Sequence, residues 1–323
     1  MKLKDPIYGE FEIKEQVLLE LIDSKPVQRL KNILQQCIPK EFQKFPSFSR
    51  YDHSLGVMLL LRRLGASVEE QAAGLLHDVS HTAFSHMIDM LLENNTKQDF
   101  QDTNHEKIIM DSELPQLLKK YGFDAKRIVE HHNYSLLEQE TPSLCADRID
   151  YALKDIYHWA QPDIVNKCVK SLLQHQGRIV FSSEEVAKLF ALGYAKCQHE
   201  RWGNADENIR VFVFVQALKL ALKEKIITFD DFYKDDSYIM NALKKAKNLE
   251  ITQILDRLKG EIRYNLVKAN PRFKIKNKFR YIDPEFLKAG KMLKLSDVDA
   301  PYKELLEQQR KEHEKGINFN LLD

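Results

Sequence analysis

The sequence predicts a mostly α-helical protein with a small β component. Over most of the 323 residues, apolar side chains recur at helical rather than alternating spacing. The chain contains only 11 Gly and 10 Pro, which argues against a loop-rich all-β fold and against a disordered chain. This length can bury a sizeable core and suits one large domain or two lobes.

The helical pattern breaks into segments that carry recognisable boundary signals. Ser67 is a predicted N-cap, because Glu70 follows three residues later as in a capping box. A further break is expected before Pro115, since proline lacks the amide proton that a helix interior requires. In chain order, the expected helical segments cover residues 54–64, 68–79, 105–118, 125–132, 142–159, 184–199, 207–223, 229–233, 237–247, 249–258 and 303–315.

Two short stretches favour β-structure. Residues 177–181 form a compact β-type run, and residues 272–282 alternate apolar with basic side chains, which predicts a half-exposed strand or hairpin. The basic side chains of the second run are expected on its solvated face: Lys274, Lys276, Lys278 and Arg280. Breaks near residues 160 and 270 suggest a core at 1–160, a helical lobe at 161–270 that completes a pocket, and a C-terminal strand-and-helix segment at 271–323.

The overall charge and the cysteines bound the class of protein. Lys and Arg total 49 against 48 Asp and Glu, a net charge of +1, which excludes a strong overall field toward nucleic acids or membranes. This total does not exclude a local basic patch, but nucleic acid is not an expected partner. The four cysteines show no CxxC spacing, and no apolar run approaches the roughly 20 residues that a membrane span needs. We therefore expect reduced thiols and a cytoplasmic protein.

The His77-Asp78 pair is the most informative local feature. It ends an apolar helical run, where an unpaired carboxylate is costly to bury. Taken alone, a capping Asp beside a hydrogen-bonded His explains it equally well. His53, His81 and Asp147 add further nitrogen and oxygen donors near predicted helix ends. A mixed set of this kind favours a divalent transition metal (Mn²⁺, Fe²⁺, Co²⁺, Ni²⁺ or Zn²⁺) over Ca²⁺.

The order of these residues resembles the H…HD…D signature of the HD-domain metal-dependent phosphohydrolases, and more closely the branch that contains the dNTP triphosphohydrolases with a SAM and an HD domain. The resemblance implies an HD-domain helical bundle with a helical extension and a small C-terminal β-containing segment. It covers residues 5 to about 160, and a weaker likeness continues to about residue 225. The matching stretches are Asp5-Pro6-Ile7-Tyr8-Gly9, Gln28-Arg29-Leu30, Arg50-Tyr51-Asp52-His53-Ser54-Leu55-Gly56-Val57, Leu76-His77-Asp78-Val79-Ser80-His81-Thr82-Ala83-Phe84-Ser85-His86 and Ala146-Asp147-Arg148-Ile149-Asp150-Tyr151.

Carried over position by position, the resemblance implies a role for each residue of the site. The catalytic metal would be bound by His53, His77, Asp78 and Asp147. Positions that support the ligands or transfer protons beside the scissile phosphate are matched by His81, Asp89 and His105. Phosphate-binding positions are matched by Arg50 and Arg148, and positions that touch a deoxyribose by Gln35, Tyr151 and Asp155.

General chemistry agrees with these roles. Arginine matches phosphate oxygens bidentately, and histidine exchanges protons near neutral pH. Asp89 could orient His81 or His105. Asp147, Tyr151 and Lys154 are spaced i, i+4 and i+7, so one helix face is expected to carry a metal ligand, an aromatic wall and a cation for phosphate.

The sequence departs from this family in two places. Ser80 and Thr82 stand where the family favours glycine, and Ala83 where it favours proline, so side chains are expected to narrow the space over the metal. After residue 160 the family's nucleotide contacts are not evident. The best local match offers Trp202 and Asn204, and Trp202 is expected in the core or at an interface rather than against a ligand.

A second metal is an open alternative. In other branches of the family, a His between the positions of His105 and Asp147 completes a binuclear site, and His131 and His132 lie in that interval. Both could instead cap a solvated helix end, where the helix dipole favours them.

The leading hypothesis is a metal-dependent phosphohydrolase in which activated water attacks phosphorus, acting on a nucleotide and preferentially on a (deoxy)nucleoside triphosphate. Mg²⁺ could enter with the substrate. The alternatives are a binuclear HD phosphodiesterase or dinucleoside polyphosphate hydrolase, and a non-catalytic HD protein that senses a nucleotide. By family resemblance, a homodimer is expected, and no membrane is an expected partner.

Overall fold

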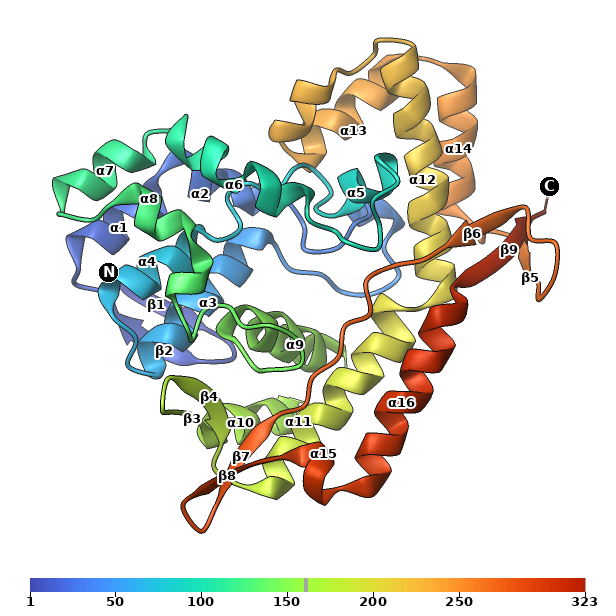
Figure 1. Cartoon of the computed structure of the whole chain (residues 1–323). Helices are drawn as coiled ribbons and strands as arrows, with labels where there is room; N and C mark the ends of the chain where they lie inside the picture. Colours follow the sequence, from blue (N-terminus) through green and yellow to red (C-terminus); the bar gives the residue numbers. More distant parts are fainter. Residues whose placement is uncertain (160–161, 323) are drawn as a thin grey trace.

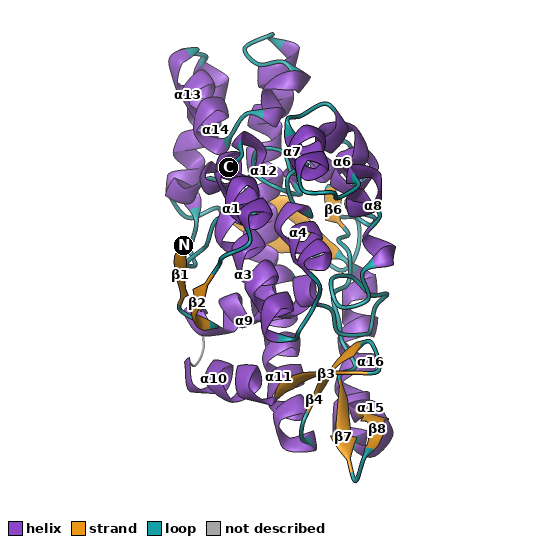
Figure 2. Ribbon diagram, turned by 90° about the vertical axis from the view of Figure 1, so that its left-hand side faces the viewer, coloured by secondary structure: helices purple, strands orange, loops and turns teal. Residues whose placement is uncertain are grey.

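The computed structural model describes residues 1–159 and 162–322, and they form a mostly helical molecule (Figure 1). The turned view shows strands only as short pieces among helices (Figure 2). The helices are α1 (Gln16–Asp23), α2 (Lys25–Arg29), α3 (Arg50–Arg63), α4 (Val68–Leu76), α5 (Met87–Leu91), α6 (Phe100–Met110), α7 (Leu114–Lys120), α8 (Ala125–Val129), α9 (Ala146–Trp159), α10 (Pro162–Ser171), α11 (Glu184–Cys197), α12 (Ala205–Lys223), α13 (Asp236–Lys245), α14 (Leu249–Lys259), α15 (Leu295–Val298) and α16 (Ala300–Lys315).

Shorter turns and nine strands complete the described chain. The 3₁₀ turns are η1 (Leu30–Asn32), η2 (Lys40–Phe42), η3 (His131–Asn133) and η5 (Phe229–Tyr233), and η4 (Gln198–Trp202) is a π-helical turn. The strands are β1 (Lys2–Asp5), β2 (Gly9–Glu12), β3 (Leu172–His175), β4 (Arg178–Phe181), β5 (Tyr264–Leu266), β6 (Phe273–Ile275), β7 (Glu285–Lys288), β8 (Lys291–Lys294) and β9 (Ile317–Leu321). They form sheets in the orders β1-β2, β3-β4-β7-β8 and β5-β9-β6.

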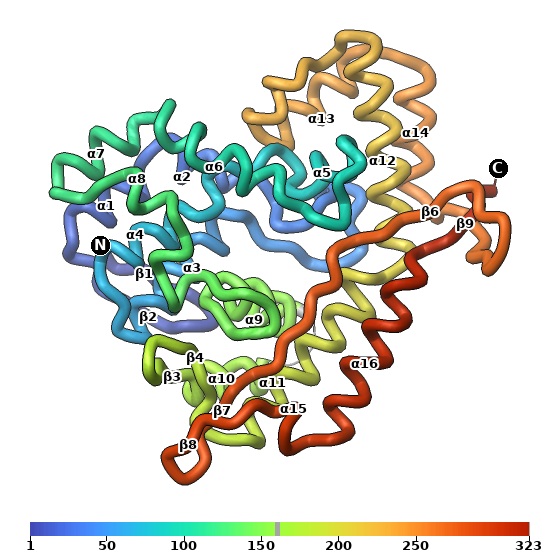
Figure 3. Tube along the Cα trace, in the orientation of Figure 1, coloured from blue at the N-terminus to red at the C-terminus, as the bar shows by residue number. Residues whose placement is uncertain are grey.

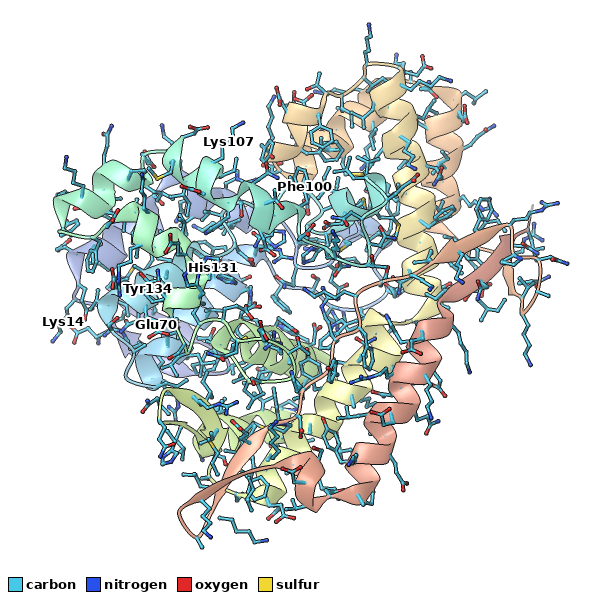
Figure 4. The ribbon with its side chains drawn as sticks, in the orientation of Figure 1. Lys14, Glu70, Phe100, Lys107, His131 and Tyr134 are labelled. Carbon is cyan, nitrogen blue, oxygen red and sulfur yellow. The ribbon has the colours of Figure 1, made fainter. Side chains whose placement is uncertain are left out.

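The mostly α-helical prediction is confirmed, and several helix ends follow from local chemistry. Ser67 caps α4 as expected, with its Oγ accepting from the Glu70 amide at 3.1 Å. The reciprocal half of the capping box is absent. The Glu70 carboxylate instead accepts from the backbone amides of Leu136 (2.8 Å) and Leu137 (3.2 Å), which ties a distant loop to this helix (Figure 4).

Helix α3 begins four residues earlier than expected. Ser49 and Asp52 form a complete capping box, with the Ser49 Oγ accepting from the Asp52 amide at 3.0 Å. His53 therefore lies within the first turn of the helix rather than before it. The imidazole ring of His53 is therefore positioned by regular helical backbone.

The prediction of a strand or hairpin at residues 272–282 is largely wrong. Only Phe273–Ile275 pairs, as β6 against β9, and residues 276–284 continue as extended coil to β7 in another sheet. Strand β9 itself was not expected, because it follows the charged helix α16. Gly316 connects α16 to β9 with φ +67°, a backbone conformation that favours glycine. A Cβ at this position would lie 2.7 Å from the Ile275 carbonyl oxygen.

Two hydrophobic clusters form the core, and they do not follow chain order. The larger one joins α1, α3, α4 and α9 with α11. The smaller one is built on α12 and α14 and takes up α5 from the first hundred residues, with Phe84 against Phe214 at 5.1 Å between ring centroids. The boundary expected at residue 160 falls on residues 160–161, outside the described residues. The one expected near residue 270 falls in the connection between β5 and β6, which both pair with β9.

Within the part of the chain that the structure describes, no helix is both long and apolar enough to cross a bilayer.

Candidate metal centre and active site

Three helix ends bring the four expected metal ligands together. His53 lies in the first turn of α3, His77 is the C-cap residue of α4, Asp78 follows it, and Asp147 is the second residue of α9. Since helix α4 ends at Leu76, the chain turns immediately after the apolar run and directs the His77-Asp78 pair toward the other two ligands.

The ligand atoms converge within a few ångströms. The Nε2 atoms of His53 and His77 are 3.2 Å apart, and the Asp147 Oδ1 lies 2.9 Å and 3.5 Å from them. Asp78 is also close to both nitrogens, with Oδ1 at 3.4 Å from His77 Nε2 and Oδ2 at 3.8 Å from His53 Nε2. Two imidazole nitrogens and the Asp147 carboxylate therefore face one point, and the Asp78 carboxylate lies next to both nitrogens.

The residues fit a divalent transition metal. The outer nitrogen of each imidazole is already bound: His53 Nδ1 contacts Asp150 Oδ2 at 2.7 Å, and His77 Nδ1 contacts the Gly74 carbonyl oxygen at 2.7 Å. These contacts leave both Nε2 atoms on the inner face, which is how imidazole ligands are usually oriented toward a metal. Nitrogen and carboxylate donors of this kind match Mn²⁺, Fe²⁺, Co²⁺, Ni²⁺ or Zn²⁺.

The electrostatics of the cluster favour a bound cation. Burial alone would lower the pKa of His77, but the carboxylates of Asp78 and Asp147 raise it to about 9. Burial alone would raise the pKa of Asp78, yet Arg50 and His77 hold it well below its usual range. With Asp150 also buried, this small volume concentrates carboxylates that need positive charge beside them.

Arg50 lies directly behind the ligand set. Its Nη1 donates to Asp78 Oδ2 at 2.7 Å and its Nε to the Ser85 Oγ at 2.8 Å. Its Nη2 is buried, lies in a side chain that lines the central cavity, and has no hydrogen-bond partner among the described residues. One free donor therefore remains beside the candidate metal position.

His81 is placed as expected, but Asp89 is not. The His81 Nε2 lies 3.2 Å from Asp78 Oδ1, in a buried position on the cavity wall. Asp89 contacts neither His81 nor His105. Its Oδ2 pairs with His86 Nδ1 at 3.1 Å, and it is His86 that lines the cavity and packs edge-on against His81. The expectation that Asp89 orients His81 or His105 is corrected accordingly.

His105 enters the site from α6 and contacts Ser80, whose side chain was expected to narrow the space over the metal. Ser80, which stands where the family favours glycine, places its Oγ 2.9 Å from His105 Nδ1 and donates to Gln101 Oε1 at 2.6 Å. The Ser80 hydroxyl thus fixes the ring of His105 rather than obstructing the site. No sequence signal linked residues 80, 101 and 105, because the contact joins the turn after α4 to the separate helix α6.

His131 contacts His105 in the cavity wall, whereas His132 points to solvent. The two Nε2 atoms of His105 and His131 are 3.1 Å apart, and His131 lies on η3 close to Tyr134 (Figure 4). The His132 side chain is 78% exposed and lies 3.7 Å from Glu130. Among the described residues, no third His, Cys, Asp or Glu donor lies within 4.8 Å of both facing nitrogens.

Two expected phosphate contacts already have protein partners. Arg148 lines the cavity, but its Nη1 donates to the Ser143 carbonyl oxygen at 2.6 Å and its Nη2 lies 3.3 Å from Glu138 Oε1. Lys154 does not reach the cavity. It is buried with its Nζ 2.7 Å from Asp150 Oδ1, so the expectation of a phosphate-binding cation there is wrong.

The three expected sugar-contacting residues all line one cavity of about 1110 Å³. Gln35 has a buried Oε1 without a partner among the described residues. The Tyr151 hydroxyl lies 2.7 Å from that of Tyr194. Asp155 is engaged by two neighbours, accepting from Trp202 Nε1 at 2.7 Å and lying 3.1 Å from Arg201 Nη2.

Sequence reasoning missed several cavity residues. Trp202 was expected in the core or at an interface, yet it lines the cavity edge-on to Tyr151 at 5.4 Å between ring centroids. Lys278 and Arg280 were expected on a solvated strand face, yet both also line it. Alternation along residues 272–282 carried no information on which other elements would approach this segment.

Comparison with known proteins agrees with this geometry. Residues 50–154 match the model of the HD domain family. The chain is 35% identical over 325 residues to the uncharacterized protein YdhJ of Bacillus subtilis, covering 100% of this chain and 99% of that protein. It is 31% identical over 272 residues to the metal-dependent phosphohydrolase cns2 of Cordyceps militaris, covering 80% of this chain and 77% of cns2.

Two more distant similarities add to this. Over 144 residues the chain is 31% identical to the deoxynucleoside triphosphate triphosphohydrolase SAMHD1 of Bos taurus, covering 37% of this chain and 24% of that protein. The fold is similar to that of a hypothetical protein from Aquifex aeolicus of known crystal structure, with a TM-score of 0.67, 18% identity, and coverage of 97% of this chain and 99% of the other. The convergent His and Asp side chains, the HD domain match and the similarity to cns2 over 80% of this chain together place this chain in the HD-domain family of metal-dependent phosphohydrolases.

Proposed function

We propose that this protein hydrolyses a nucleoside triphosphate, preferentially a deoxynucleoside triphosphate, to a nucleoside and tripolyphosphate. The observation that carries the proposal is the buried, unpartnered Nη2 of Arg50 beside Asp78 in the ligand set. A buried guanidinium that offers a free donor next to a metal site suits a phosphate oxygen, and the contact would be charge-assisted.

The rest of the cavity suits a nucleoside attached to that phosphate. Its volume of about 1110 Å³ is ample for a nucleotide. Tyr151 and Trp202 offer aromatic surface for a sugar or base, and the free Gln35 Oε1 could accept from a sugar hydroxyl. Similarity to SAMHD1, which is named for triphosphohydrolysis of deoxynucleotides, supports this choice within the region that aligns.

Each residue of the site would have a distinct task. The divalent metal, when bound by His53, His77, Asp78 and Asp147, lowers the pKa of water and polarises a phosphoryl oxygen. Arg50 would bind an oxygen of the reacting phosphate and stabilise its developing charge. His105 would exchange a proton at Nε2, since its Nδ1 is held by Ser80 at 2.9 Å.

The direct test is product analysis with a panel of substrates in the presence of Mn²⁺. Deoxynucleoside and ribonucleoside triphosphates, nucleoside monophosphates and dinucleoside polyphosphates would each be incubated with the protein, and the products separated by anion exchange. The proposal expects nucleoside and tripolyphosphate from the triphosphates, and no product from the Asp78→Ala variant. Orthophosphate released only from monoesters would contradict it, and binding of metal and nucleotide without turnover would indicate the sensing alternative.

A binuclear phosphodiesterase or dinucleoside polyphosphate hydrolase is the second candidate. It is favoured by one observation, the 3.1 Å approach of His105 Nε2 to His131 Nε2, which could bind a second metal. The mononuclear proposal stands first because these two nitrogens lack a third protein donor within the described residues. Measuring the number of metals per chain separates the two candidates.

A further inference from the structure

Residues 276–284, here called the crossing segment, run from one sheet to another alongside the active-site cavity. They connect β6, which pairs with β9, to β7, which pairs with β4 and β8. Figures 1 and 3 show this extended stretch passing in front of α12 and α11. Its residues 277–281 line the cavity that is also lined by three of the four candidate metal ligands, His77, Asp78 and Asp147.

The crossing segment is fixed on both of its sides. On the inner side, the Arg280 amide donates to Gln198 Oε1 at 3.2 Å, and the Asn277 side chain donates to that of Asn208. On the outer side, the His313 Nε2 of α16 contacts the Asn277 carbonyl oxygen at 2.7 Å. The backbone of the crossing segment is therefore held in place, and this positions the side chains that line the cavity.

Arg280 differs from the other arginines of the cavity wall. Three of them contact a carboxylate within 4.0 Å: Arg50 with Asp78, Arg148 with Glu138, and Arg201 with Asp155. Arg280 has no such ion pair with any described residue. Its Nη2 donates only to the neutral Gln98 Oε1, at 2.6 Å.

The charge of Arg280 is felt by groups that line the cavity. The side chain is only partly exposed. Burial dominates the raised pKa of Tyr151 and the lowered pKa of His86, but Arg280 contributes a lowering influence to both. Both groups line the cavity, so the guanidinium lies within electrostatic reach of its interior.

We propose that Arg280 binds the phosphates of the substrate that lie beyond the reacting one. The Arg280 guanidinium is partly buried and has no anionic partner among the described residues. It lies in the same cavity wall as the candidate metal site and the free donor of Arg50. Such a group suits the distal phosphates of a polyphosphate chain. This inference rests on the proposed function, because it assigns Arg280 to the same cavity, and it names a polyphosphate as the class of ligand. Lys278, on the same segment, adds a second positive charge nearby.

Inorganic tripolyphosphate is the probe that tests Arg280 without requiring turnover. Its dissociation constant and that of orthophosphate would be measured by calorimetry, with metal present, for the wild type, Arg280→Ala and Arg280→Gln. Arg272→Ala is the matched control, because Arg272 is exposed directly before β6, close in sequence to the crossing segment, and does not line the cavity. Far-UV circular dichroism and thermal melting would establish that each variant is folded, and Arg280→Gln keeps a long polar side chain should the alanine variant unfold.

The expected result is tripolyphosphate binding that is weaker by about tenfold or more in both Arg280 variants, as for a lost charge-assisted hydrogen bond. Orthophosphate binding should change far less, and Arg272→Ala should behave as wild type. Equal tripolyphosphate affinity in wild type and Arg280 variants, or no tripolyphosphate binding to the wild type, would overturn the inference. If the wild type hydrolyses monoesters alone while the Arg280 effect persists, the proposed function is overturned and the inference about Arg280 stands.

Discussion

Asp150 holds the outer nitrogen of His53, with Oδ2 and Nδ1 separated by 2.7 Å and both side chains fully buried. Lys154, one turn further along α9, approaches the same carboxylate at 2.7 Å and 2.9 Å. Gly56 of α3 makes room for this pair, because a Cβ there would collide with the Asp150 carboxylate and the Lys154 ammonium. The orientation of His53 thus depends on a contact between two helices.

Asp150→Asn should weaken metal binding while the ligand residues stay intact. An amide cannot supply the negative charge that fixes the ring of His53, and loss of such a partner typically costs 10–100-fold in metal affinity or activity. Metal affinity would be measured by competition with a chelator of known affinity. Asp256→Asn is a suitable control, since that exposed carboxylate pairs only with Lys259. Wild-type affinity in Asp150→Asn would contradict the role assigned to this residue.

His105→Ala should lose activity but keep one metal per chain. We expect the mononuclear centre, since His53, His77, Asp78 and Asp147 make no use of His105, whereas His105 Nε2 is placed to exchange a proton. Metal content by inductively coupled plasma mass spectrometry would check this on protein prepared with excess Mn²⁺ under exclusion of oxygen. A ratio near two in the wild type that falls to one in both His105→Ala and His131→Ala would establish the binuclear alternative instead.

Arg50→Ala should reduce kcat/KM by tenfold or more on every phosphorylated substrate. The variant removes a charged hydrogen bond to phosphate, which contributes about 1.5–3 kcal/mol, and about 1.4 kcal/mol corresponds to one factor of ten. Arg62→Ala is the matched control, because Arg62 lies at the far end of the same helix and pairs with Glu15 at 2.5 Å. Steady-state kinetics with the metal content verified would decide. Activity of Arg50→Ala equal to that of wild type would exclude the phosphate-binding geometry.

Asp236 should make the folded state less stable as the pH rises from about 4.5 to 7. Its carboxylate accepts from the amides of Phe84 (2.7 Å) and Leu34 (3.1 Å), and burial raises its pKa to about 6. The folded state then binds more protons than the unfolded chain between the ordinary Asp value, near 3.9, and about 6. This stabilising contribution is complete below that interval and lost above it.

The free energy of unfolding should fall by about 2 kcal/mol between pH 4.5 and pH 7 because of Asp236. Urea unfolding at pH 4.5 and 7.0 would be compared for wild type and Asp236→Asn, which does not titrate. The wild type should lose about 2 kcal/mol more than the variant over this range. An identical pH dependence of the two proteins would refute the assignment.

Much of the fold and the candidate ligand set was predictable from the sequence, because these features depend on local patterns. Helical periodicity and the Ser67 cap involve residues within one or two turns of each other. The order His53, His77-Asp78 and Asp147 was informative because few chemistries other than metal binding justify such donors at apolar helix ends. The start of α3 was also a local matter, but the Ser49–Asp52 capping box was not recognised.

Contacts between separate elements were decided by the tertiary structure alone. Lys154 shares a helix face with Asp147 but lies about 10 Å further along the axis, where α3 packs and Asp150 binds it. Asp89 pairs with His86, and Arg280 reaches the cavity because β6 and β7 belong to different sheets. The sequence by itself determined which residues could bind a metal, since that depends on donor type and local spacing. Only the tertiary structure decided which charges face the cavity and which neutralise one another, since that depends on which distant segments pack together.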